Sequence, residues 1–328
     1  MVLRLDRRTL LRGAGATVLS TPFIGSARAA NYPDRTVRII VPFAAGGPSD
    51  ITARLMSVKL QEALGQSFIV ENRAGAGSNL GTLAVARSTP DGYTLLVVSS
   101  AFVVNPSLYK NVPYDAFKDF APICEIDTSP NVFVATNASG ITSIKDMIAR
   151  AKAKPDDLVY ASAGIGTTPH LATELLKLTE NVRITHVPYG GSGPATQSIL
   201  AGTVPLMCGS LPGLHGAIKN GQVRALAVTG ETRWFDMPEV PTMIELGYKD
   251  FVVDTFHCMQ APAGTPQDVV DKLASTCIAA LKEPAFRDKL RSAGFETIAN
   301  GPDGLRKRIA NDIQRYKTII EKAGIERV

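Results

Sequence analysis

The stretch TVRIIVPFAAGGPSDITARLMSVKLQEAL, from Thr36 to Leu64, decides the fold predicted for this chain. Its apolar run Val37 to Val41 predicts a buried strand, which ends at a proline. The loop Ala44-Ala45-Gly46-Gly47-Pro48 follows, and Ser49 and Asp50 supply capping side chains for a helix. This order directs backbone N–H groups and the positive end of the helix dipole at one point. We therefore expect the loop to hold the carboxylate of a small ligand. The alternative is an ordinary tight turn between a strand and a helix.

The same plan recurs further along the chain. Short apolar runs that predict strands alternate with helix-forming segments, and these runs are Phe68–Val70, Tyr93–Val98, Leu158–Ala161 and Arg183–Val187. Such alternation favours an α/β protein built from parallel βαβ units. Because ligands bind beyond the carboxyl ends of the strands in such sheets, we expect the site to lie among the loops there.

The loops at these strand ends share an unusual composition. They are rich in Gly, Ser, Thr and Ala and contain no lysine or arginine, and they are Pro42–Asp50, Ser99–Asn105, Ser162–His170 and Pro188–Pro194. Backbone N–H donors and helix dipoles can bind an anion without a cationic side chain. We interpret the loops as a clamp for the anionic group of a small molecule.

The first 29 residues predict an export signal. The segment Asp6-Arg7-Arg8-Thr9-Leu10-Leu11-Arg12 resembles a twin-arginine signal, with an ordinary secretory signal as the alternative, and Ala27-Arg28-Ala29 predicts cleavage before Ala30. Removing its five arginines and one aspartate leaves 30 basic and 29 acidic residues. A nearly neutral mature chain gives no reason to expect binding to nucleic acid or to a membrane surface.

The mature length favours two domains, since single cores stop growing at roughly 250–300 residues. The four cysteines, Cys124, Cys208, Cys258 and Cys277, form no C-x-x-C motif. In an exported protein they can form two disulfides or remain buried thiols, and their spacing does not decide between these.

Other chemistries have little support in the sequence. Gly75-x-Gly77-x-x-x-Gly81 is one residue too long for a dinucleotide fingerprint, so no cofactor is expected. His186, His215 and His257 show no metal-site spacing. His170 at a predicted helix start and Cys208 in an apolar strand are candidates for a general base and a nucleophile, but a loop histidine and a core thiol are the simpler interpretations.

Several ordered motifs resemble one family over Tyr32 to about Ile325. They are Ile40-Val41-Pro42-Phe43-Ala44-Ala45-Gly46-Gly47 with Asp50, Val70-Glu71-Asn72-Arg73-Ala74-Gly75-Ala76-Gly77, Pro90-Asp91-Gly92-Tyr93-Thr94-Leu95-Leu96, His186-Val187-Pro188-Tyr189, and Ala261-Pro262-Ala263-Gly264-Thr265-Pro266. The chain resembles the extracytoplasmic solute receptors of tripartite tricarboxylate transporters, also called the Bug family.

The resemblance implies a class II-like, two-lobed α/β binding protein with a mainly parallel sheet in each lobe and a ligand cleft between the lobes. We predict a first lobe of residues 30–130 plus 254–328 and a second lobe of residues 131–253. It also implies a periplasmic monomer, without enzymatic activity, that closes on a small organic acid and delivers it to a membrane permease. The alternatives are an exported enzyme for a small acid and a ligand-sensing receptor for a signalling partner.

The loops that match the family's ligand contacts give the predicted site, which includes no catalytic residue and no metal ligand. The predicted ligand-binding residues are Phe43, Ala44, Ala45, Gly46, Gly47, Asp50, Ser78, Asn79, Ser99, Ser100, Ala101, Ser162, Gly164, Gly166, Thr167, Thr168, Tyr189, Gly190, Gly191 and Ser192. The sequence departs from the family pattern at Gly190, at Cys208-Gly209 and at Thr255-Phe256-His257-Cys258, so the identity of the acid does not follow.

Overall fold

The computed structural model describes residues 32–249, 251–322 and 324–328. The predicted export signal, residues 1–29, lies outside these residues. Residues Pro33–Val328 cluster as one compact unit. None of the helices in the described ranges is long and apolar enough to cross a membrane.

Two groups of elements, called lobe 1 and lobe 2 here, share the long strand β4 (Phe120–Thr136). Lobe 1 contains β1 (Val37–Val41), α1 (Pro48–Leu64), β2 (Phe68–Asn72), η1 (Ala76–Ser78), α2 (Asn79–Ala86), β3 (Thr94–Ser99), α3 (Ala101–Leu108), β9 (Asp254–Pro262), α8 (Gln267–Lys282), α9 (Pro284–Ser292), β10 (Glu296–Asn300) and α10 (Pro302–Lys322). Lobe 2 contains η2 (Asn137–Ser139), α4 (Ile144–Ala153), β5 (Val159–Ser162), α5 (Thr168–Glu180), β6 (Thr185–Pro188), α6 (Ser192–Leu200), β7 (Leu206–Ser210), α7 (Leu211–Lys219) and β8 (Val223–Val228).

The strands form one mixed sheet in the order β2-β1-β3-β9-β4-β7-β5-β6, and β10 and β8 pair with β4. Parallel pairing joins β1 to β2 and β3 in lobe 1, and β5 to β6 and β7 in lobe 2. The predicted α/β fold with parallel βαβ units is therefore confirmed. The long strands add antiparallel pairs, because β4 runs against β7, β8, β9 and β10.

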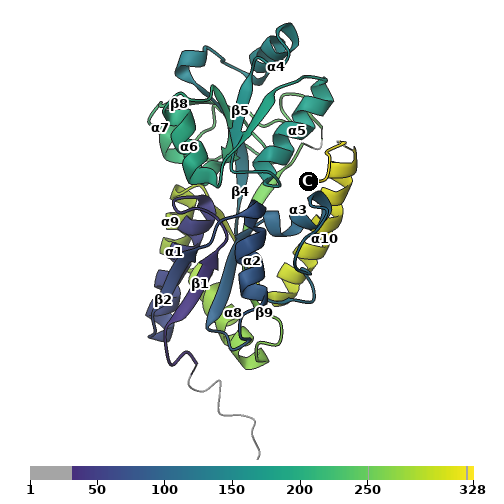
Figure 1. Cartoon of the computed structure of the whole chain (residues 1–328). Helices are drawn as coiled ribbons and strands as arrows, with labels where there is room; N and C mark the ends of the chain where they lie inside the picture. Colours follow the sequence, from purple (N-terminus) through teal and green to yellow (C-terminus); the bar gives the residue numbers. More distant parts are fainter. Residues whose placement is uncertain (1–31, 250, 323) are drawn as a thin grey trace, which may run out of the picture. The chain divides into compact units, whose positions relative to one another are not determined.

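Strand β4 connects the two lobes without a break (Figure 1). It pairs with β9 as far as Pro130, opposite Asp254, and with β7 from Asn131, opposite Ser210. Pro130 lies within the strand, at the position where its partners change. The predicted lobe boundary lies beside this change and stays a prediction.

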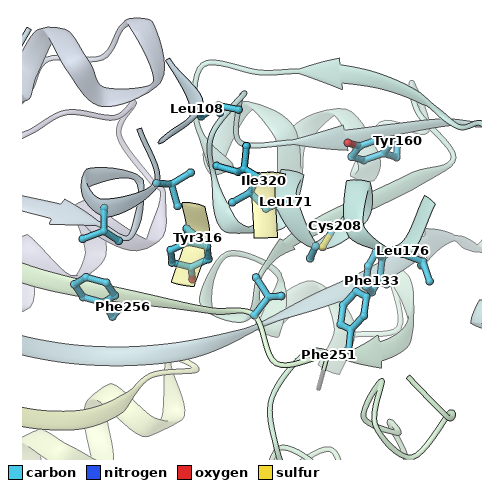
Figure 2. Close-up of a cluster of buried hydrophobic side chains, with 14 of the residues drawn as sticks. Leu108, Phe133, Tyr160, Leu171, Leu176, Cys208, Phe251, Phe256, Tyr316 and Ile320 are labelled. Carbon is cyan, nitrogen blue, oxygen red and sulfur yellow. The ribbon is translucent and has the colours of Figure 1, made fainter. Parts of the chain in front are cut away.

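One apolar core includes residues of both lobes. Figure 2 shows Leu108 of α3 and Tyr316 and Ile320 of α10 in the same cluster as Leu171 of α5 and Cys208 of β7. All five are almost completely buried. Because the cluster crosses from one lobe to the other, the two lobes are packed against each other in this conformation.

Two local predictions differ from the structure. The loop predicted at Ser99–Asn105 is mostly helix α3, which tolerates Pro106 inside it. Ser49 and Asp50 lie in the first turn of α1, whose N-cap is Gly47. In each case a small or proline-containing sequence permits more than one helix start, and neighbouring loops select among them.

Replacing Gly81 with alanine is expected to destabilise the protein by about 1–3 kcal/mol, the usual range for overpacking. A Cβ atom on Gly81 would lie 2.6 Å from the Arg73 carbonyl oxygen and 2.8 Å from the Pro42 Cβ. The matched control is Gly216→Ala in α7, where the new Cβ meets nothing within 4 Å. That variant should be stabilised by about 0.5–1 kcal/mol through its helix propensity. Chemical denaturation measures the free energy of unfolding of both variants. A Gly81→Ala variant as stable as the wild type would contradict the expectation.

Candidate ligand-binding site

A small cavity lies between lobe 1 and lobe 2. Its volume is about 30 Å³, which is room for about two or three water molecules. Its walls are Phe43, Gly47, Pro48, Ser49, Ser99, Ala163, Thr167, Thr168, Pro169, Ser192, Ser210, Thr255 and His257. These residues include no lysine, arginine or carboxylate, and His257 is the one titratable side chain among them.

The polar part of this wall consists largely of helix starts. Gly47 precedes α1, Thr167 precedes α5, Ser210 precedes α7, and Ser192 is the first residue of α6. The first N–H groups of a helix have no partner inside the helix, and the helix dipole places partial positive charge there. Helix starts from both lobes therefore give the cavity an attraction for anions without any cationic side chain.

The carboxylate of Asp50 organises the loop that precedes α1. Its Oδ2 accepts hydrogen bonds from the Gly46 N–H at 3.0 Å and from Arg54 Nε at 2.9 Å. Its Oδ1 accepts one from Asn72 Nδ2 at 3.0 Å. Burial raises the pKa of Asp50, but these hydrogen bonds outweigh burial and leave the pKa below its usual value. The ionised side chain holds the loop in place, and Asp50 itself is not part of the cavity wall.

A hydrogen-bonded junction joins the lobes beside the cavity wall. Thr168 of α5 and Thr255 of β9 are hydrogen bonded through their hydroxyl groups. Thr255 Oγ1 also donates to Asn131 Oδ1 at 2.9 Å, and all three residues are buried. Since Asn131 lies where β4 changes partners, the junction connects β4 to the start of α5.

Glycines let the facing loops of the two lobes come into contact. A Cβ atom on Gly193 of α6 would lie 2.8 Å from the Ala45 carbonyl oxygen, and one on Gly191 would lie 3.2 Å from the Ala44 Cβ. Gly191 has φ +151°, which disfavours any other residue. The lobes therefore approach backbone to backbone in the closed conformation.

A buried relay of three side chains ends at the cavity wall. His257 Nδ1 lies 2.6 Å from Asp127 Oδ1, and Thr52 Oγ1 donates to Asp127 Oδ2 at 2.7 Å. All three residues have no measurable exposure. His257 Nε2 is also buried and has no hydrogen-bond partner in the described part of the chain. Buried polar atoms are seldom left unpaired in folded proteins.

The structure brings part of the predicted site together around the cavity. The predicted residues in the cavity wall are Phe43, Gly47, Ser99, Thr167, Thr168 and Ser192. The other predicted residues lie outside that wall, and they are Ala44, Ala45, Gly46, Asp50, Ser78, Asn79, Ser100, Ala101, Ser162, Gly164, Gly166, Tyr189, Gly190 and Gly191. Their role in ligand binding stays a prediction, and several of them shape the loops. For example, Asn79 Oδ1 accepts a hydrogen bond from Asn105 Nδ2 at 2.8 Å.

Sequence reasoning missed Ser210, Thr255 and His257 as site residues. Ser210 ends β7 and packs against β4, where its hydroxyl lies 2.9 Å from that of Ser129. Thr255 and His257 lie two residues apart on β9 and so project from the same face of that strand. This polar alternation within an apolar strand was the signal available in the sequence.

The two candidates for enzymatic chemistry lie away from this cavity. Cys208 is in the apolar core, and burial raises the pKa of its thiol to about 12. His170 lines a different cavity, beside His186 and the end of the chain, and burial lowers its pKa to about 4. A thiol with such a pKa supplies almost no thiolate near neutral pH. All four cysteines are free and buried. The structure therefore has buried thiols and not the two disulfides that the sequence also allowed.

These features together define a two-lobed solute-binding protein that closes on a small anion-attracting cavity. The chain belongs to the family described as "Tripartite tricarboxylate transporter family receptor", whose model matches residues 52–325. The family resemblance predicted from the sequence motifs is confirmed.

Similar proteins cover almost the whole chain. Protein BugT of Bordetella pertussis is 36% identical over 322 residues, which is 98% of this chain and 99% of that protein. The structure of periplasmic binding protein BugD is 38% identical with a TM-score of 0.87, covering 90% of this chain and 99% of that one. The structure of R. palustris Rpa4515 with adipate is 34% identical, with the same TM-score and coverages. MatC of Rhodopseudomonas palustris with bound malate is 31% identical with a TM-score of 0.84, covering 88% and 100%.

Proposed function

We propose that this chain is a periplasmic receptor that captures a small organic acid between its lobes and delivers it to the membrane permease of a tripartite tricarboxylate-type transporter. The observation that carries the proposal is the cavity wall, in which helix starts from both lobes converge with no cationic side chain. One carboxylate group fits such a wall because backbone N–H donors and helix dipoles satisfy its oxygens. The cavity has room for about two or three water molecules in this conformation, so it widens to take the rest of the acid. Lobe closure, with no covalent chemistry, then retains the acid.

Structures similar to this chain support an acid as the ligand. Rpa4515 was solved with adipate and MatC with malate, and both acids carry two carboxylates. These two structures align with 90% and 88% of this chain, so the similarity includes both lobes. We carry over the class of ligand, a small carboxylate, and not either acid in particular.

The proposal includes export and action as a monomer. Residues 1–29 supply the export signal, and the receptor starts at Ala30 after cleavage. Lobe 1 then comprises residues 30–130 plus 254–328, and lobe 2 comprises residues 131–253. The predicted ligand-binding residues outside the present cavity wall contribute through the loops that they shape or through a more open conformation.

A thermal-shift panel on protein that starts at Ala30 tests the proposal. The panel contains mono-, di- and tricarboxylates, aromatic acids and acidic amino acids. An acid at a hundred times its Kd should add about 2.7 kcal/mol of stability. For a protein of this size that corresponds to a rise in Tm of a few degrees. The acid should be recovered unchanged after incubation.

A matched pair of variants shows whether the acid binds in the cavity. Ala163→Leu places a larger side chain in the cavity wall and should remove the ligand-induced shift. Ala153→Leu at the exposed end of α4 should keep it. The Tm of each variant without ligand checks that it folds. No shift with any acid would contradict capture of a carboxylate, and consumption of the acid would favour an enzyme.

A further inference from the structure

The relay of Thr52, Asp127 and His257 fixes one nitrogen of the imidazole and leaves the other for a ligand. Asp127 is a fully buried carboxylate, and the described chain offers its oxygens two partners, Thr52 and His257. A carboxylate accepts hydrogen bonds, so His257 Nδ1 carries the proton that lies between the two side chains. This contact sets the orientation of the ring.

The free nitrogen, Nε2, belongs to a side chain in the cavity wall. His257 shares this wall with Thr255, which projects from the same face of β9, and with Ser99, its partner in the register of β3. The ring packs edge-on against Phe295, with centroids 5.7 Å apart. Nε2 is completely buried and lacks a partner among the described residues. Leaving a buried polar atom unpaired is costly, so a ligand atom that pairs with it gains affinity.

The position of His257 complements the helix starts. The helix starts of α1, α5 and α6 can satisfy one carboxylate, as argued for the proposed function. Among the residues of the cavity wall, His257 adds a nitrogen that can bind a second group. A neutral ring accepts a hydrogen bond at Nε2, as from a hydroxyl, whereas a protonated ring donates one, as to a carboxylate. Both partners are oxygen functions.

We infer that His257 Nε2 binds a second oxygen function of the ligand, so that this receptor selects dicarboxylates or hydroxy acids over simple monocarboxylates. The inference rests on the proposed function, because it assigns a specificity-determining residue within the same cavity. Asp127 and Thr52 act as positioning residues that hold the ring.

The test uses three acids of equal chain length: hexanoate, 6-hydroxyhexanoate and adipate, with the four-carbon set butyrate, 4-hydroxybutyrate and succinate in parallel. Calorimetric titration should show that the wild type binds the hydroxy acid or the diacid at least about tenfold tighter than the methyl-terminated acid, the usual effect of one good hydrogen bond. Preference for the hydroxy acid identifies a neutral ring, and preference for the diacid a protonated one.

The variant His257→Phe should reduce this preference to about twofold or less while it keeps the affinity for the methyl-terminated acid. His215→Gln, which lies outside the cavity wall and is paired with Asp236 at 3.0 Å, is the control and should keep the preference. If His257→Phe keeps the same preference as the wild type, or if the wild type shows no preference, this inference is overturned and carboxylate capture is left intact. A wild type that binds none of these acids overturns the inference, whereas the proposed function is decided by the thermal-shift panel with its wider set of acids.

A second measurement does not depend on the folding of a variant. The chain has four histidines, so their ring nitrogens can be followed by NMR in the wild-type protein. The preferred acid should shift the Nε2 signal of the histidine whose Nδ1 is hydrogen bonded to a carboxylate, and the same shift should appear in His215→Gln. A ring spectrum that does not change on saturation with the acid overturns the inference.

Discussion

Replacing Arg308 with methionine is expected to destabilise the protein by about 3–5 kcal/mol at neutral pH, the usual result of removing one partner of a buried ion pair. Arg308 of α10 lies 2.8 Å from Asp254 Oδ2, 2.6 Å from Asp312 Oδ2 and 3.8 Å from Glu125 Oε1. Glu125 and Asp312 are 1% and 5% exposed. Methionine fills much of the volume but leaves these carboxylates without their main counter-ion.

The pH dependence of this loss has a defined sign. Burial raises the pKa of Glu125 and of Asp312 even with Arg308 present. A carboxyl group with a raised pKa in the folded state costs stability once it ionises, so its cost disappears as the pH falls. Without Arg308 the pKa values should rise further. The difference in unfolding free energy between variant and wild type should therefore shrink as the pH is lowered from about 7.5 to about 5.

The neighbouring Arg306 provides the control. Its side chain is 62% exposed and lies 3.9 Å from Asp303, which is itself 94% exposed. Exposed pairs of this kind contribute little, so Arg306→Met should change stability by less than about 1 kcal/mol. Denaturant titration of both variants at several pH values gives the comparison. Equal effects of the two substitutions would show that the Arg308 cluster is not a main support of lobe 1.

Replacing Gly193 with alanine is expected to weaken ligand binding by about tenfold to a hundredfold. The new Cβ would lie 2.8 Å from the Ala45 carbonyl oxygen of the other lobe, but only when the lobes are closed. A steric conflict of this kind typically costs about 1–3 kcal/mol. The cost falls on the closed state alone, so the apparent Kd rises with the loss of closed population.

Gly216→Ala is the control for this prediction. The residue lies in α7 outside the predicted site, and its new Cβ meets nothing within 4 Å. We expect its affinity for the acid to match that of the wild type. The affinities are measured by calorimetric titration with the acid that gives the largest thermal shift. If Gly193→Ala binds as tightly as Gly216→Ala, the observed contact between the loops is not needed for capture.

The local parts of this structure follow from the sequence. The sequence predicts the strand Val37–Val41, its glycine loop and the following helix. It does so because an apolar run, loop-forming residues and a helix-forming segment follow one another directly in the chain. The same holds for the repeated units of lobe 2. The N-cap of α4 is Ser143, whose hydroxyl accepts a hydrogen bond from the Asp146 N–H at 3.1 Å, again a contact between near neighbours.

The missed parts depend on contacts between distant residues. His257 and Asp127 are 130 positions apart and meet because β9 and β4 pair in one register. No local pattern specifies that register, so the relay could not be read from either segment alone. Helix α3 was missed because its apolar residues and Pro106 also suit an extended loop, and the packing of α10 against it supplies the missing preference.

The four buried thiols have a consequence for how the opening of this protein can be followed. None of them closes a covalent loop, so maturation requires no oxidative step and no disulfide exchange catalyst. Cys124 lies in β4, Cys258 in β9 and Cys277 in α8, while Cys208 lies in β7 of lobe 2. Each thiol becomes reactive only when its own surroundings open. The protein thus carries built-in labels for local opening. Because Cys208 and Cys258 belong to the core that both lobes share, alkylating reagents should reach these two thiols together.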